Sequence, residues 1–253
     1  LSNQTGRDFG TREVIRPPRQ IRMDDWLRFF GIWLAEGWTT RTRQCVVGLC
    51  QKEGPKARTI AGWIAVCGLH AGERTTPEGL VRFEITDKPL YEYLVQFGKS
   101  HDKFIPRELL ELSSRQLRIL YAAMMLGDGS GHRYATVSDR LADDVMELIL
   151  KIGGAPSKRK DVAENRFGPT GAVWNIHQNT RNVGATVCNL YFDQRSYVDY
   201  TGDVWCAEVP PHHLLYVERN GKACWSGNSW WFKENVLKWW AMFMARYSIP
   251  LAE

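Results

Sequence analysis

The chain has 253 residues, 44% of them hydrophobic and 12% aromatic, with a formal net charge of +5. This allows one large core or two smaller ones, and it permits an anionic partner without requiring one. The absence of CxxC pairs among the six cysteines argues against a zinc site or a disulfide framework, and no apolar run reaches the ~18 residues of a membrane span.

The first half of the chain predicts helices and strands in a regular order. A helix is predicted from the acidic pair Asp24-Asp25 to about Ala35, and Gly37 ends it. Further on, the spacing of apolar residues predicts strands over 44–50 and 80–86 and helices over 56–68 and 88–98.

The second half repeats this order. Helices are predicted over 114–126 and 139–152, and strands over 134–137, 172–178 and 185–190. The sequence helix, strands, helix therefore occurs twice, which predicts an internal duplication. After about Tyr200 the composition changes, and the pattern predicts strands over 204–209 and 214–217, a hairpin turn at Asn220-Gly221 and a tryptophan-rich helix over 230–247.

Two short stretches, residues 29–37 and 121–129, share one pattern. Each is an apolar helical run that ends in a small residue, a carboxylate and a glycine, and the carboxylates are Glu36 and Asp128. Parallel packing of the two helices through their small residues would bring the carboxylates together, and a hard divalent cation such as Mg²⁺ would relieve their repulsion. For either copy alone, a solvated helix end is the simpler interpretation.

The paired stretches resemble the two LAGLIDADG (DOD-type) motifs of homing endonucleases, with Glu36 and Asp128 at the metal-binding acidic positions. The segment Lys103-Phe104-Ile105-Pro106 before the second motif is similar to the Lys-x-x-Pro of intein-borne members, and residues 137–145 resemble the strand and helix that follow it. The resemblance implies an α+β fold: a duplicated αββαββα monomer with a pseudo-two-fold axis and saddle-shaped antiparallel sheets.

The family implies an activity as well as a fold. The expected activity is a metal-dependent double-strand cut in double-stranded DNA, with Lys103 either polarising the scissile phosphate or water or serving as an ordinary surface lysine. Basic residues would contact DNA phosphates, and the candidates are Arg41, Arg43, Lys158, Arg159 and Lys160. Solvated surface charge is the alternative for these clusters.

The C-terminal region carries a second kind of chemistry. An asparagine amide can attack its own backbone carbonyl and cleave the chain, with a following serine as acyl acceptor and a histidine assisting proton transfer. The region resembles the C-terminal splicing blocks of inteins (a partial Hint segment), with His213, Asn228 and Ser229 at the matching positions. Cys206 stands where aspartate is commoner; it is a candidate nucleophile or a small strand residue.

The resemblance also predicts a division of the chain. Residues 1–20 are expected to be a lead-in from a truncated N-terminal part without a splicing block, 21–199 the endonuclease domain, 200–228 the splicing segment and 229–253 a host extein that faintly resembles Mu-like phage portal proteins. We expect a cytoplasmic protein of a bacterial or phage-infected cell, with free thiols and no membrane partner. The alternatives are a DNA-binding regulator or maturase that does not cut, and a degenerate insertion in a structural phage protein.

Overall fold

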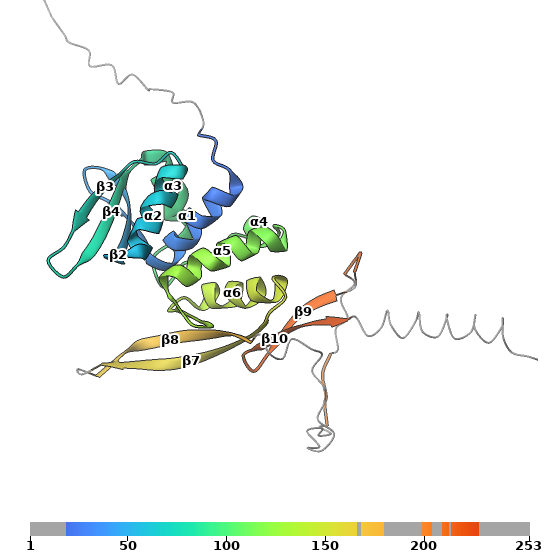
Figure 1. Ribbon diagram of the computed structural model, residues 1–253. Coiled ribbons are helices and arrows are strands. Elements are labelled where there is room, and N and C mark those ends of the chain that lie inside the picture. Colours follow the sequence, from blue (N-terminus) through green and yellow to red (C-terminus); the bar gives the residue numbers. More distant parts are fainter. Residues whose placement is uncertain (1–18, 166–167, 180–198, 204–208, 213, 228–253) are drawn as a thin grey trace, which may run out of the picture.

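A computed structural model describes residues 19–165, 168–179, 199–203, 209–212 and 214–227. Over these residues the protein combines helices with two antiparallel sheets, and the helices gather between the sheets (Figure 1). No helix in the described part is long and apolar enough to cross a membrane.

The first half builds a four-stranded sheet with helices on one face. Its elements in chain order are α1 (Met23–Glu36), β1 (Gly37–Arg41), β2 (Cys45–Lys52), α2 (Pro55–Val66), β3 (Ala71–Thr75), β4 (Leu80–Thr86), α3 (Lys88–Leu94) and a 3₁₀ turn, η1 (Val95–Phe97). The strands lie in the order β1-β2-β4-β3.

The second half repeats this plan. A short helix, α4 (Arg107–Leu110), leads to α5 (Ser114–Gly127), β5 (Gly129–Ser130), β6 (Arg133–Thr136), α6 (Asp139–Lys151), β7 (Ala155–Asn165) and β8 (Gly168–Asn179). These strands lie in the order β5-β6-β8-β7, which matches the first sheet and confirms the predicted duplication. A C-terminal hairpin of β9 (Leu214–Arg219) and β10 (Lys222–Gly227) extends the second sheet beyond β7.

The predicted helices of both halves are present, with ends close to the expected residues. The sequence did not predict β1, β3, β5 and β7. The first three are edge strands, and their residues are exposed or half-buried, so no buried face imposes an alternation of apolar and polar residues. The segments predicted at 185–190 and 230–247, and residues 204–208 of the strand predicted over 204–209, lie outside the described residues.

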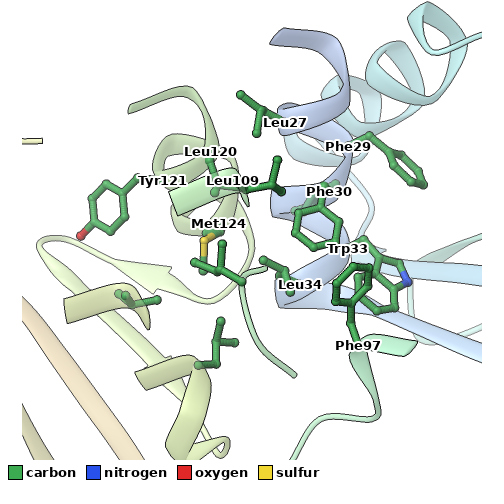
Figure 2. Close-up of a cluster of buried hydrophobic side chains, with 14 of the residues drawn as sticks. Leu27, Phe29, Phe30, Trp33, Leu34, Phe97, Leu109, Leu120, Tyr121 and Met124 are labelled. Atoms are coloured by element: carbon green, nitrogen blue, oxygen red, sulfur yellow. The ribbon is translucent and has the colours of Figure 1, made fainter. Parts of the chain in front are cut away.

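The core lies where the two halves meet. From α1, the side chains of Leu27, Phe30 and Leu34 are buried against those of Leu120 and Met124 from α5 (Figure 2). Around this contact the rings of Trp26, Phe30, Trp33 and Phe97 stack or meet edge to face. Helix α1 is buried from Phe29 to Leu34 and packs against the buried face of α5, and the candidate site lies at the end of this helix pair.

Candidate catalytic site and nucleic-acid interface

Helices α1 and α5 pack in parallel and at close range. A Cβ atom on Gly31 would lie 2.8 Å from the Cβ of Ala123, and one on Gly127 would lie 2.5 Å from the Cβ of Ala35. The contacts advance in the same direction along both helices, so both helices end on the same side of the molecule. The predicted role of the small residues is therefore confirmed.

The two motif carboxylates lie at this common end. Glu36 is the last residue of α1, and Asp128 directly follows α5. The carbonyl end of a helix carries partial negative charge, so a carboxylate there is unfavourable on its own. Both halves nevertheless place one there, which indicates that something positive offsets the cost.

The local environment discourages ionisation of both acids. Burial of the carboxyl group, followed by the neighbouring Glu36 charge, raises the pKa of Asp128 to about 7, although the residue as a whole is exposed. Burial also raises the pKa of Glu36, although the hydrogen bond that the Gln51 side chain donates to it, at 3.2 Å, opposes this shift. The pair is thus destabilised as two free anions.

The donor set suits a hard divalent cation. Two carboxylates supply oxygen ligands, and a cation between them would relieve the repulsion that raises the Asp128 pKa. Within the described ranges no cluster of three or more His, Cys, Asp or Glu side chains could hold a metal ion. Magnesium often uses only one or two carboxylates and takes its other ligands from water and substrate phosphates, so this pair fits it.

A cavity of about 240 Å³ adjoins Asp128. Lys103, Ser100 and Thr136 also line it, together with apolar side chains. A water molecule occupies roughly 30 Å³ in the liquid, so the cavity has room for a hydrated ion beside the carboxylate.

Lys103 is a buried residue, which excludes the alternative that it is an ordinary surface lysine. Its side-chain ammonium donates to the backbone oxygens of Trp33 (2.9 Å), Leu34 (2.9 Å) and Gly37 (2.7 Å), at the C-terminal end of α1. Burial lowers its pKa to about 8, against the opposing effect of Asp128 and Glu36. Lys103 thus satisfies the last carbonyls of α1 and supplies positive charge beside both acids.

The backbone around Lys103 is tied to the other half of the molecule. Its carbonyl oxygen accepts a hydrogen bond from the Ser138 hydroxyl at 2.7 Å, and the Ile105 N–H donates to the Asp144 carboxylate at 2.8 Å. The Arg140 guanidinium stacks over the Phe104 ring at 3.5 Å. The segment from Lys103 to Pro106 therefore connects the end of α1 to helix α6.

The predicted basic cluster on β7 is split between two faces. Successive strand residues point to opposite sides, and Lys158 and Lys160 lie on the side covered by α6. Lys158 forms ion pairs with Asp143 and Glu218, and Lys160 with Asp139. Arg159 is on the open face, where it forms an ion pair with Asp161 at 2.6 Å. Of the three, only Arg159 is placed where a large ligand could lie across the sheet.

The other predicted basic residues lie at the turn between β1 and β2. Arg41 and Arg43 are both exposed there, at the tip of a hairpin. Along β2, Arg41 is opposite Cys45, whereas Arg82 on β4 is opposite Cys50, so the hairpin tip lies several residues away from Arg82.

Sequence reasoning missed an arginine pair on the open face of the first sheet. Arg74 and Arg82 are directly opposite each other on β3 and β4, and both are exposed. Like charges in this arrangement repel, and within the described ranges neither arginine forms an ion pair. The alternation of Arg82 with buried Val81 and Phe83 was a usable signal, because it places the arginine on the uncovered face.

The predicted splicing residues cannot be placed. Cys206, His213, Asn228 and Ser229 lie outside the described residues.

Comparisons with known proteins give relatives of different names. No protein-family model matches the chain. It is 25% identical, over 87% of its length, to a "DNA-directed RNA polymerase subunit beta C-terminal section" of Stigeoclonium helveticum, and 29% identical, over 74%, to an "ATP-dependent Clp protease proteolytic subunit" of Chlamydomonas moewusii. The chain spans only 25% and 19% of these two proteins.

Among solved structures, homing endonucleases are similar to this chain. Mesophilic variants of I-DmoI align with a TM-score of 0.47 at 11% identity, covering 64% of this chain and 91% of that one. I-DmoI in complex with DNA and Ca gives the same TM-score and identity, with 64% and 85% covered. I-WcaI bound to its DNA recognition sequence gives a TM-score of 0.36 at 12% identity, with 62% and 77% covered.

Proposed function

We propose that the protein is a DNA endonuclease that makes metal-dependent double-strand cuts, as an αββαββα monomer with an internal pseudo-two-fold axis. The observation that carries this proposal is the pair Glu36 and Asp128. Two duplicated, parallel helices each end in a carboxylate at the same place, and the pKa of Asp128 is raised partly by the charge of Glu36. An arrangement so unfavourable without a cation is consistent with cation binding.

In this proposal the chain's own residues hold the ion and the DNA. Glu36 and Asp128 bind Mg²⁺ or another divalent cation, which when bound supplies Lewis acidity toward a phosphate and activates water. Gln51 orients the Glu36 carboxylate, and Lys103 fixes the end of α1. Because its three hydrogen bonds go to backbone oxygens, we assign Lys103 a positioning role in place of direct contact with the scissile phosphate.

Duplex DNA is the proposed partner, lying across the open faces of both sheets. The arginine pair Arg74 and Arg82 supports this, because the phosphates of a polyanion would convert their repulsion into attraction. Arg159 on the second sheet, and Arg41 and Arg43 at a hairpin tip, are further proposed phosphate contacts.

The test compares cleavage with binding in carboxylate variants. Purified protein is incubated with a plasmid library of randomised targets and Mg²⁺, and linearised products are sequenced. We expect the wild type to cut, and Glu36→Gln and Asp128→Asn to lose at least about 100-fold in rate while still shifting duplex DNA in gels. Unchanged cleavage by both variants would remove the metal assignment. A wild type that binds but never cuts would favour the regulator or maturase.

A second proposal is that this nuclease is part of an inserted element. Most of the chain is shared with a polymerase subunit and a protease subunit, yet it makes up only a quarter or a fifth of each. A segment shared by proteins of such different names is the pattern expected of a mobile insertion. This supports an intein with 21–199 as nuclease, 200–228 as splicing segment and 229–253 as host sequence, resembling a phage portal protein and made in the cytoplasm.

The splicing proposal has its own chemistry and test. The Asn228 side-chain nitrogen would attack its own backbone carbonyl carbon, forming a succinimide and releasing the amine of Ser229, with His213 assisting proton transfer and Cys206 as a further candidate nucleophile. Mass spectrometry of the full open reading frame should detect cleavage between Asn228 and Ser229, and Asn228→Ala should abolish it. Intact host protein from both forms would favour a degenerate insertion.

A further inference from the structure

The C-terminal hairpin is built into the second sheet. Strand β10 lies between β7 and β9, with Lys222 paired to Ser157. The Lys158 N–H donates to the Gly221 carbonyl oxygen at 2.7 Å, which brings the turn of the hairpin against β7. The segment predicted to serve splicing therefore shares a sheet with the nuclease half (Figure 1).

Side-chain contacts fix which face of the hairpin is turned toward the helices. The Lys158 ammonium lies 2.7 Å from the Glu218 carboxylate on β9 and also pairs with Asp143 on α6. Ala223 on β10 is 9% exposed and belongs to the core under α6. Because strand residues alternate, Lys222, which precedes Ala223, is on the opposite, open face.

The strand registers place Lys222 in a row that crosses the sheet. Arg133 on β6 is opposite His177 on β8, which is opposite Ser157 on β7, which is opposite Lys222 on β10. Arg133, His177 and Lys222 are exposed, and Ser157 is half-buried. The next register position, on β9, is Arg219. No position of this row is acidic.

The length of the row matches a feature of duplex DNA. Neighbouring strands are roughly 4.8 Å apart, so Arg133 and Lys222, three strands apart, are separated by about 14 Å. The major groove of B-DNA is about 12 Å wide. Within the described ranges neither cation forms an ion pair, so both are available to phosphates on the two sides of one groove.

We propose that the C-terminal hairpin contributes Lys222 as a phosphate contact, so that the splicing segment and the nuclease half form one DNA-binding surface. This inference rests on the proposed DNA-binding function and assigns part of it to the hairpin. Arg133 holds one side of the groove, Lys222 the other, and His177 with Ser157 lies between them. Docking of the hairpin on β7 is required, because Lys222 has its place in the row only when β10 is in the sheet.

The test measures duplex DNA binding by fluorescence anisotropy between 50 and 200 mM salt, with catalysis stopped by Ca²⁺. We expect Lys222→Gln to weaken binding roughly three- to tenfold at the low-salt end and to reduce the salt slope by about one. The matched control is Lys88→Gln, which removes an equally charged lysine from α3 on the helical side and should leave both quantities unchanged.

A second variant separates the contact from the docking. A side chain at Gly221, whose φ is +69°, would collide with the Lys158 carbonyl, so Gly221→Ala should release the hairpin turn from β7 while keeping Lys222. We expect it to weaken binding as much as Lys222→Gln, with no further loss in the double variant. Additive losses of affinity in the double variant would overturn this inference and leave the proposed function standing. The same conclusion would follow if Lys222→Gln had no effect on affinity while Arg82→Gln weakened binding. A wild type that does not bind would overturn the proposed function.

Discussion

At the scale of single residues, the site concentrates charge where the backbone opposes it. Glu36 and Asp128 stand at carbonyl ends of helices, and burial raises the pKa of each. Gln51 and Lys103 offset part of this cost, the first by a hydrogen bond to Glu36 and the second by its charge. Part of the negative charge of the two carboxylates stays uncompensated, and a divalent cation would neutralise it.

The raised pKa of Asp128, about 7, predicts that metal binding depends on pH. Below pH 7 the carboxyl group holds a proton that the cation must displace, so affinity for Ca²⁺ or Mg²⁺ should fall about tenfold per pH unit between pH 7 and 5. Calorimetric titration at several pH values in buffers of different ionisation enthalpy measures both the affinity and the released proton.

The raised pKa of Asp128 also determines how the stability of the metal-free protein changes with pH. The pKa of Asp128 in the folded protein lies above the ordinary value of 3.8. Its stabilising contribution to the free energy of unfolding is therefore fully present below pH 3.8 and is lost as pH rises through 7. Asp128→Asn should remove both pH dependences. An affinity for metal that is flat from pH 5 to 8 in the wild type would contradict the assignment of Asp128 as a ligand.

At the scale of elements, the contact between α1 and α5 depends on residues without bulk. Gly31 is in the middle of α1, where a Cβ atom would lie 2.8 Å from both the Leu120 carbonyl oxygen and the Ala123 Cβ. We expect Gly31→Ala to lower the free energy of unfolding by about 1–3 kcal/mol, because the backbone of α5 cannot move away cheaply. Urea denaturation measures the change.

The chain provides a matched control for this prediction. Gly62 is an exposed residue of α2 with no atom within 4 Å of where a Cβ would be. Gly62→Ala should be neutral or should stabilise the protein by up to roughly 1 kcal/mol, through helix propensity. Equal changes in the free energy of unfolding for the two substitutions would show that close packing does not determine the effect of Gly31→Ala.

The elements also show how far sequence patterns reach. The repeated small-acid-glycine pattern predicted both carboxylates and their helices, because the same packing and charge requirements select the same residue types at both positions. No such pattern identifies the roles of the residues of β7, because Lys158-Arg159-Lys160 look like one basic patch in the sequence. Two of them serve ion pairs under α6, as only the register with β8 reveals.

At the scale of the whole molecule, one short segment connects the two halves. Lys103 binds the end of α1, and the backbone beside it is held by Ser138 and Asp144. The sequence could single out Lys103 by resemblance, but not its burial, because burial depends on contacts with residues far away in the chain.

Replacing Lys103 by Met should lower the free energy of unfolding by about 1–3 kcal/mol, because buried carbonyl oxygens at the end of α1 lose their donor. Denaturation followed by circular dichroism measures this loss. Lys99→Met, four residues earlier at an exposed position, should leave stability unchanged. If Lys103→Met lowered cleavage without any loss of stability, a direct role at the phosphate would replace the positioning role.

In the proposed nuclease, the glycine and alanine contacts between α1 and α5 would also set the geometry of the product. Backbones that touch through such small groups leave almost no freedom in the separation of Glu36 and Asp128. For the proposed nuclease, the stagger between the cuts in the two strands is therefore a fixed dimension of the protein. Every cleaved site should carry overhangs of one length, whatever bases it contains.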